Sequence, residues 1–416
     1  MRTLLMGHYI NIQARHGEGA FKAYLSVPAC GNGPGLVLGQ EIFGVNANMR
    51  ETADMYAEEG YVVLVPDLFW RLEPGVELGY TPKDFDKALG LNGSLDLDKA
   101  VDDIAASIDA LRELNEVDQP SIGYVGYCLG GKLAFLAATR TDLAVSIGYY
   151  GMGIEGFLDE ADALQGGLVL HHAELDSYCD VEARTRIAAG LAGRKGVELY
   201  TYPEADHAFA RLGSEHYHKS SAHMAHGRTI GALKKYIGPE YNLSHLWDQH
   251  VHHEFVTRDV PATMATMVKE PYVNHIPTLT GGVGSKQLSR FYEHHFVHAN
   301  PPDIRSIPIS RTVGAFQVVD EFIMCFTHTT EIDWMLPGVA PTGKYVEIPM
   351  LGVINFRGDK LCHEHLYWDQ ASVLVQIGLL DPVGLPVAGI ETAKKLIDES
   401  LPSNTLMRRW ASSENL

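Results

Sequence analysis

The chain reads Ile122-Gly123-Tyr124-Val125 and continues as Gly126-Tyr127-Cys128-Leu129-Gly130-Gly131, which predicts a buried strand running through a tight turn into a helix. Glycine has no Cβ, so Gly126 and Gly130 allow the strand and helix backbones to approach closely around this turn. The turn lifts the Cys128 side chain above the sheet and directs the following backbone N–H groups at the same point. We expect a thiol in this position to attack a carbonyl carbon if a base and an orienting acid come from elsewhere in the chain.

Two later segments supply such partners. Asp176 follows the apolar run 167–170, and His207 follows the strand-like run 197–201. Both therefore lie at the carboxyl ends of predicted parallel strands, where catalytic groups gather in open α/β sheets. A lone cysteine or histidine is more often a packing or surface residue. The order nucleophile, acid, base favours a Cys-His-Asp triad, in which Cys128 attacks, His207 moves the proton and Asp176 orients the imidazole.

The first half of the chain has the rhythm of a parallel sheet. Apolar runs at 36–38 and 61–65 alternate with helical patterns such as 97–116. This predicts the α/β class, as an α/β-hydrolase domain whose mostly parallel sheet carries helices on both faces. A helix ending at Ile237 meets Gly238-Pro239, which is a strong stop signal, so we expect this domain to span residues 1–240.

The second half has a different plan. Residues 243–269 predict two amphipathic helices, the second capped by Asp259 with Pro261 in its first turn. Alternating strands then follow, at 306–319, 321–333, 344–356 and 360–376. Helices followed by an antiparallel sheet indicate an α+β domain, which we expect over 241–390, with a C-terminal helix and tail over 391–416.

Several motifs of the first half occur together, at 40–46, 49–52, 66–68, 126–131, 148–151 and 207–211. With them, the chain from about residue 10 to about residue 240 resembles the dienelactone hydrolase (carboxymethylenebutenolidase) family. The resemblance implies cofactor-independent hydrolysis of a small-molecule lactone or activated ester through a thioester on Cys128. It also implies an oxyanion hole formed by the backbone N–H groups of Ile42 and Leu129.

The resemblance gives roles to further side chains. Glu41 would lie beside the nucleophile and control its ionisation, although a carboxylate at the start of a helix near Asn46 is the alternative reading. Arg211 would bind a substrate carboxylate through its planar fork of donors. Substrate contacts are also expected from three residues: Phe43, Tyr127 and Ala208.

The sequence departs from the family at the second substrate-binding arginine. Residues 72–111 contain no arginine, and Arg71, Lys83 and Lys87 are the candidates to replace it. This departure bears on the identity of the substrate and not on the chemistry expected of Cys128.

Segments 255–259, 272–277, 326–328, 336–343 and 367–370 resemble SnoaL-like members of the nuclear-transport-factor-two-like superfamily. That resemblance implies a cone-shaped α+β domain used for cyclase or isomerase chemistry, for binding a small ligand, or for forming a homo-oligomer such as a dimer. Titratable residues that interrupt its strands are pocket candidates: His275, His328, Glu331, His365 and Asp369. The alternative, that these are hydrogen-bonded structural residues, stays open.

Composition and charge narrow the choice of partners. The 416 residues carry a net charge of −19, which argues against nucleic acid or an anionic membrane as a partner. The five cysteines are scattered, and we expect neither a signal peptide nor a membrane span, hence a reduced, cytoplasmic protein. The 20 histidines show no HExxH spacing at 252–254 or 363–365, so we expect no metal and no cofactor.

Overall fold

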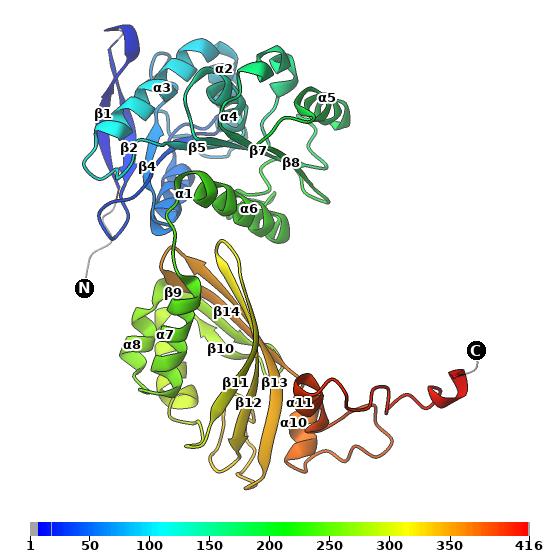
Figure 1. Cartoon of the computed structure of the whole chain (residues 1–416). Coiled ribbons are helices and arrows are strands. Elements are labelled where there is room, and N and C mark those ends of the chain that lie inside the picture. Colours follow the sequence, from blue (N-terminus) through cyan, green and yellow to red (C-terminus); the bar gives the residue numbers. More distant parts are fainter. Residues whose placement is uncertain (1–6, 18, 415–416) are drawn as a thin grey trace. The chain divides into compact units, whose positions relative to one another are not determined.

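The computed structural model describes residues 7–17 and 19–414. The chain divides after Glu240 into two compact units, and each is described here by itself. Helix and strand labels are those of Figure 1.

The first unit is built on an eight-stranded sheet within the described residues, in the order β1-β2-β4-β3-β5-β6-β7-β8. Strands β1 and β2 pair antiparallel with their neighbours, and the remaining strands run parallel. The five strands β3 to β7 are buried along their whole length, as expected for a sheet covered on both faces. The strands are β1 (His8–Gln13), β2 (Ala20–Ser26), β3 (Gly35–Gly39), β4 (Val62–Pro66), β5 (Gly123–Tyr127), β6 (Val145–Tyr149), β7 (Gly167–Ala173) and β8 (Val197–Tyr202).

Helices cover both faces of this sheet. Figure 1 shows α1 and α6 on one face, and α3 and α4 packed together on the other. The predicted α/β fold is confirmed, including the helix that begins after its N-cap Asn46. The helices are α1 (Ala47–Glu58), α2 (Pro82–Ser94), α3 (Leu97–Glu113), α4 (Leu129–Arg140), α5 (Val181–Leu191) and α6 (Lys219–Ile237).

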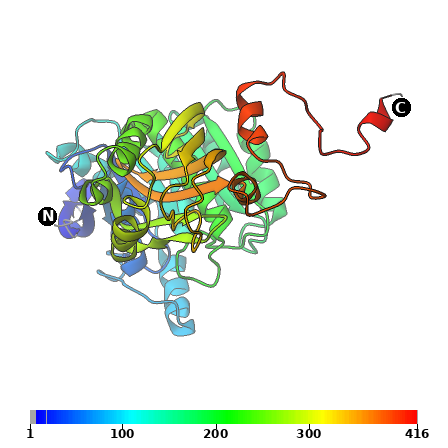
Figure 2. The ribbon, with the colours of Figure 1, turned by 90° about the horizontal axis from the view of Figure 1, so that it is seen from below.

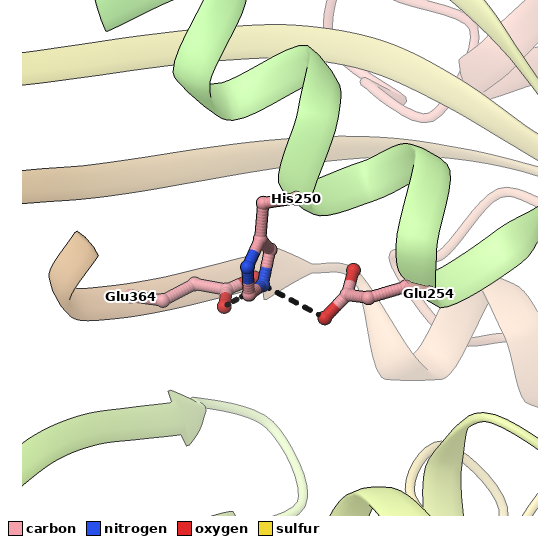
Figure 3. A group of neighbouring side chains, drawn as sticks. All are labelled: His250, Glu254 and Glu364. Carbon is pink, nitrogen blue, oxygen red and sulfur yellow. Dashed lines mark ion pairs between the residues drawn. The ribbon is translucent and has the colours of Figure 1, made fainter. Parts of the chain in front are cut away.

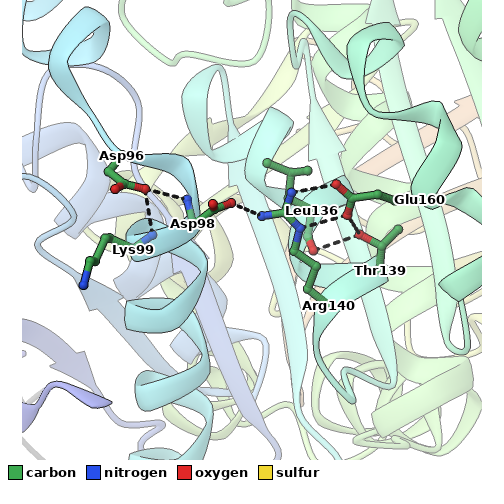
Figure 4. Close-up of polar contacts among 7 residues, drawn as sticks. All are labelled: Asp96, Asp98, Lys99, Leu136, Thr139, Arg140 and Glu160. Carbon is green, nitrogen blue, oxygen red and sulfur yellow. Dashed lines mark hydrogen bonds and ion pairs between the residues drawn. The ribbon is translucent and has the colours of Figure 1, made fainter. Parts of the chain in front are cut away.

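A group of polar contacts fixes the far end of α4 (Figure 4). Arg140 forms a two-bond fork with Glu160, at 2.8 Å and 2.6 Å, and its third nitrogen lies 2.7 Å from Asp98 near the start of α3. Asp96 caps α3 by accepting hydrogen bonds from two backbone N–H groups of its first turn. Because α4 begins directly after Cys128, these contacts help to hold the helix that presents the thiol.

The turn between β5 and α4 leaves no room for a side chain at Gly126. A Cβ there would lie 2.1 Å from the carbonyl oxygen of Gly130, which is backbone and cannot move aside. We expect Gly126→Ala to lower the free energy of unfolding by ~3 kcal/mol or more. Gly90→Ala, at an exposed position of α2 where a Cβ meets nothing within 4 Å, should raise it by about 1 kcal/mol. Denaturant unfolding of both variants checks this, and equal stabilities would contradict the account of the turn.

The second unit contains a six-stranded sheet within the described residues, in the order β10-β9-β14-β13-β12-β11. Side chains of β12 alternate between its faces: Met324 and Phe326 enter the main core, while Ile323 and Cys325 pack against α11 on the other side. The strands are β9 (Met267–His275), β10 (Thr280–Val283), β11 (Arg305–Val313), β12 (Gln317–Thr327), β13 (Tyr345–Arg357) and β14 (Lys360–Trp368). The helices are α7 (Leu243–Phe255), α8 (Val260–Ala265), α9 (Gly284–Phe291), the π-helical turn η4 (Tyr292–Phe296), α10 (Gln370–Gln376) and α11 (Glu391–Ile397).

Five expectations for this unit were wrong in detail. The strand expected over 321–333 is β12, which begins at Gln317 and ends at Thr327 because the loop that leads to β13 starts at His328. The sheet is mixed, because β14 pairs in parallel with β9, a strand that the sequence pattern did not predict. The second helix ends at Ala265, not 269, because β9 begins at Met267. The strand expected over 306–319 stops at Val313, where Gly314 bonds to the Gln317 carbonyl and closes a hairpin. The strand expected to reach 376 stops at Trp368 because Asp369 caps α10.

The chain beyond α11 runs as an extended, exposed segment that ends in a short 3-10 turn (Figures 1 and 2). Throughout the residues described, we find no helix that combines the length and apolar character required to cross a bilayer.

Candidate active site

Cys128 lies at the end of β5 in a conformation that few residues adopt. Its φ is 54° and its ψ is −109°, and the residue is 3% exposed. Such backbone strain persists only where the surrounding structure imposes it. Here the Cys128 N–H donates to the Tyr149 carbonyl and the Gly130 N–H donates to the Gln40 carbonyl, so neighbouring strands hold both sides of the turn.

The two expected partners of the thiol meet each other. Asp176 follows β7 and His207 follows β8, and His207 Nδ1 donates to Asp176 Oδ2 at 2.8 Å. The carboxylate side chain is 1% exposed and the imidazole 13% exposed. The bond fixes the tautomer, so Nε2 is the nitrogen free to exchange a proton with another group.

Charge couples the three groups. Burial disfavours the imidazolium, but the hydrogen bond to Asp176 and the interaction with the nearby Cys128 outweigh it and raise the pKa of His207 to about 10. Burial would also raise the pKa of Asp176, but the hydrogen bond and charge of His207 lower it below its ordinary value. These interactions favour the imidazolium form of His207.

Two aromatic rings confine the imidazole. Tyr150 and Tyr178 both meet it edge-on, with ring centroids 5.1 Å and 5.0 Å from that of His207. Tyr150 has a positive φ of 39°, which is unusual for a residue with a bulky side chain. The sequence pattern gave Tyr150 no role, because an aromatic residue after a buried strand is equally typical of a core.

Glu41 and Arg211 form a buried ion pair. Arg211 Nε lies 2.9 Å from Glu41 Oε2, with the two side chains 10% and 3% exposed. The Tyr150 hydroxyl donates to the other oxygen of Glu41 at 3.4 Å. The alternative of a helix-start carboxylate is wrong, because α1 starts at Ala47 with Asn46 as its cap and has no acidic residue in its first turn.

Arg211 is also held by aromatic faces. Its guanidinium carbon lies 4.6 Å from the centre of the Tyr80 ring and 5.3 Å from that of Phe43. The Tyr80 hydroxyl in turn accepts a hydrogen bond from Asn46 at 3.2 Å. Sequence reasoning expected Phe43 here but missed Tyr80, which lies in a segment without a recognisable motif.

The remaining expected site residues lie in the turns and strand ends that also carry the candidate catalytic residues. Leu129 is the first residue of α4, so its N–H has no partner within the helix. Ile42 is buried in the turn after β3, and Ala208 adopts a left-handed φ of 65° directly after His207. Tyr127 is 7% exposed, and its hydroxyl lies 3.0 Å from that of Tyr56, so it contributes to packing below the site.

Two of the cations considered in place of the second arginine are engaged by carboxylates. Arg71 pairs with the fully buried side chain of Asp103 and stacks on Trp70. Lys87 pairs with Glu73 at 2.7 Å.

The pocket candidates of the second unit have different surroundings. His275 is enclosed by aromatic rings, its Nδ1 lies 2.9 Å from Thr280, and burial lowers its pKa to about 3. His328 is buried with Nδ1 3.1 Å from Thr342. Within the described residues, no three of the five form a group that could hold a metal ion.

The other three have separate surroundings. Glu331 is exposed, His365 packs beside the Tyr272 ring, and Asp369 caps α10. Trp334 and Trp368 belong to the core of the unit. A pocket of about 280 Å³ elsewhere in the unit is lined in part by His295 and Asp333, which lie 2.8 Å apart.

The sheet order, the strained turn after β5 and the residues at the ends of β7 and β8 define an α/β-hydrolase. The model of the dienelactone hydrolase family matches residues 21–237, and the chain belongs to this family of hydrolases.

Individual proteins match the same half of the chain. A protein from Azospirillum brasilense is 37% identical over 223 residues, which cover 53% of this chain and 96% of that protein. The carboxymethylenebutenolidase 1 of Cupriavidus pinatubonensis is 35% identical over 225 residues, or 54% of this chain and 95% of the relative. Among solved structures, a Klebsiella pneumoniae protein matches with a TM-score of 0.49 and 24% identity, over 55% of this chain and 99% of that one.

Proposed function

We propose that the first unit hydrolyses lactones or activated esters through a Cys128-His207-Asp176 triad and a thioester intermediate. One observation carries this proposal: His207 Nδ1 donates to Asp176 at 2.8 Å, and Cys128 at the strained turn is near enough to His207 to raise the pKa of its imidazole. The carboxymethylenebutenolidase relatives support the lactone class of substrate.

The reaction would run in two halves. The Cys128 thiolate attacks the acyl carbon, and the oxyanion accepts hydrogen bonds from the N–H groups of Ile42 and Leu129. The bond to the leaving oxygen then breaks, His207 gives that oxygen its proton, and a thioester remains on the sulfur. Water next attacks the thioester while His207 takes its proton. The C–S bond breaks, the carboxylic acid leaves, and the thiolate and imidazolium return, with one water consumed per ester.

The Glu41–Arg211 pair gives the site a means to detect a substrate carboxylate. Such a carboxylate would compete for the guanidinium, which is already positioned by Tyr80 and Phe43. Glu41 would then be released from Arg211 and become free to interact with the thiol of Cys128. Substrates that carry a carboxylate are therefore expected to be preferred over neutral esters of equal reactivity.

Hydrolysis assays test the proposed reaction. The full chain is expected to hydrolyse dienelactone, which carries a carboxylate, and more slowly a neutral ester such as p-nitrophenyl acetate. Failure to turn over either compound, in a protein whose thiol is reduced, would overturn the proposal.

The preference for a carboxylate is tested by removing the ion pair as a unit. We expect Arg211→Met combined with Glu41→Gln to raise KM for dienelactone about 30- to 100-fold, since a charge-assisted fork of hydrogen bonds is lost. Both partners are changed because a buried carboxylate left alone would destabilise the fold. Steady-state kinetics give kcat/KM for dienelactone and for the neutral ester, and the ratio of these two values measures the preference for a carboxylate.

A matched change on the surface serves as the control for this experiment. Arg194→Met with Asp162→Asn removes an exposed pair of similar length, 2.8 Å, and should leave both substrates unaffected. An equal loss of kcat/KM for both substrates in the variant with Arg211→Met and Glu41→Gln would show that the ion pair supports the fold and does not select the substrate.

For the second unit, we propose a SnoaL-like fold that binds a small ligand or joins two copies of the chain. Its six-stranded sheet, with α7, α8 and α9 packed against it and one another, supports the fold assignment. The cross-strand pair Leu351 and Tyr367 leaves large apolar groups exposed on the sheet, at 38% and 40%, which supports pairing. Sedimentation analysis of the full chain distinguishes a dimer from a monomer.

A further inference from the structure

A group of three ionisable side chains is buried in the second unit (Figure 3). His250 and Glu254 lie one turn apart on α7, and Glu364 reaches them from β14. All three are nearly inaccessible to solvent, at 0%, 2% and 2% exposed. Residues four apart lie on the same face of a helix, so the fold brings both α7 side chains to the strand.

The distances between the polar atoms of these three side chains are suitable for ligands of a single metal ion. His250 Nε2 lies 3.0 Å from Glu254 Oε1 and 3.8 Å from Glu364 Oε2. One ligand atom from each residue lies within 4.8 Å of the others. Ligands that bind a tetrahedral Zn²⁺ at ~2.1 Å are roughly 3.4 Å apart, a value between the two measured distances.

Contacts with Thr266 and Trp247 orient the imidazole of His250. Thr266 donates its hydroxyl proton to the Thr263 carbonyl at 2.6 Å, so His250 Nδ1 must be the donor in its own 2.6 Å bond to Thr266. This tautomer directs the Nε2 lone pair at the two carboxylates. The Trp247 ring stacks on the imidazole at 5.6 Å and is itself anchored by a 2.8 Å bond to Asp320. Metal-binding histidines are typically held by a second hydrogen bond in this way.

Within the described residues, His250 Nε2, Glu254 Oε1 and Glu364 Oε2 make ion-pair contacts with one another but no hydrogen bond of good geometry. The Tyr292 hydroxyl beside them also lacks a hydrogen bond of good geometry. Tyr292 is 1% exposed, and its hydroxyl is close enough to interact with both carboxylates. Buried polar groups are normally partnered, and this concentration indicates a missing ligand. Tyr292 begins the π-helical turn η4, a distortion that is frequent at functional sites.

Charge leads to the same conclusion. Two ionised carboxylates carry a charge of −2, and within the described part of the chain their ion-pair partner is His250 and not a lysine or arginine. A divalent cation would neutralise the group without requiring a buried proton.

We propose that His250, Glu254 and Glu364 bind a divalent transition-metal ion of the Zn²⁺ class. One imidazole nitrogen and two carboxylate oxygens are ligands that such ions accept, and three protein ligands leave a further coordination position for water. The Tyr292 hydroxyl lies beside the ligating oxygens and can donate a hydrogen bond to one of them or to that water. The site is independent of Cys128 and of the proposed hydrolysis.

Metal analysis of untagged full-length protein tests this proposal. The protein is stripped with a chelator, loaded with Zn²⁺ or Co²⁺ and desalted, and a Cys128→Ala sample is treated in parallel so that an ion on the thiol is not counted. We expect about one ion per chain in both samples, a visible ligand-field absorption for Co²⁺, and a higher thermal midpoint with metal than without.

Two variants of the second unit localise the ion. Glu364→Gln keeps the shape of the side chain but should weaken binding at least 100-fold, by loss of a charged ligand. His252→Gln, on the exposed face of the same helix, should bind as the wild type does. Equal binding by the two variants would overturn the proposal. So would wild-type protein that retains no ion after loading, a result that does not depend on the folding of any variant and leaves the hydrolase proposal intact.

Discussion

Replacing Cys128 by alanine is expected to lower kcat/KM for activated esters by at least ~10⁴-fold while the protein stays folded. In the proposed mechanism the sulfur forms the covalent intermediate, and alanine has no nucleophilic atom to replace it. The variant retains the Cβ, so the strained backbone and the packing around it should persist. Ester hydrolysis, together with circular dichroism, measures the two effects separately.

Cys30→Ala is the matched control for this variant. Cys30 is an exposed thiol whose Sγ lies 3.1 Å from the Asn32 carbonyl in its own loop. The same chemical change there should leave activity within about twofold of the wild type. Substantial ester hydrolysis by folded Cys128→Ala protein would show that the chemistry occurs elsewhere.

The second large effect is expected from Asp176→Asn. Asparagine keeps the shape of the side chain but cannot stabilise an imidazolium, so kcat should fall ~10²- to 10⁴-fold. The pKa of His207, raised to about 10 with Asp176 in place, should fall towards its ordinary value in the variant. The alkaline limit of kcat/KM should therefore move to lower pH, which a pH–rate profile measures.

The raised pKa of His207 also determines how the stability of the fold depends on pH. Because the folded state raises the pKa of His207 above 6.5, the interaction stabilises the fold fully below that pH and is lost as pH rises through about 10. Asp180→Asn, an exposed position in the same loop whose side chain caps α5, should change neither profile. An unchanged alkaline limit in Asp176→Asn would contradict the role given to the carboxylate.

The turn at Cys128 could be predicted because its determinants are local: a buried strand, glycines at the points of close approach, and a following helix. The positions of Asp176 and His207 were predictable from the rule that parallel strands end at one edge of the sheet. The Glu41–Arg211 pair was not, since its members are 170 residues apart and each had a separate expected role. Tyr80 and Tyr150 carry no pattern that distinguishes a site residue from a core residue.

The second unit was less predictable for a related reason. The parallel pairing of β9 with β14 joins segments that are distant along the chain, and neither segment signals the other. The group formed by His250, Glu254 and Glu364 depends on that pairing, because β14 delivers one of its three members. Spacing within the sequence therefore gave no metal signature, and only the fold brings the three proposed ligands together.

The most direct test of the central claim is the mass of the protein quenched during turnover of a slow p-nitrophenyl ester. We predict an increase equal to the acyl group, located by peptide mapping on Cys128 and removed by hydroxylamine, as expected of a thioester. Acylation of another residue would contradict the claim that Cys128 is the nucleophile. So would release of p-nitrophenol with no acyl group found on Cys128 when the sample is quenched before one turnover is complete.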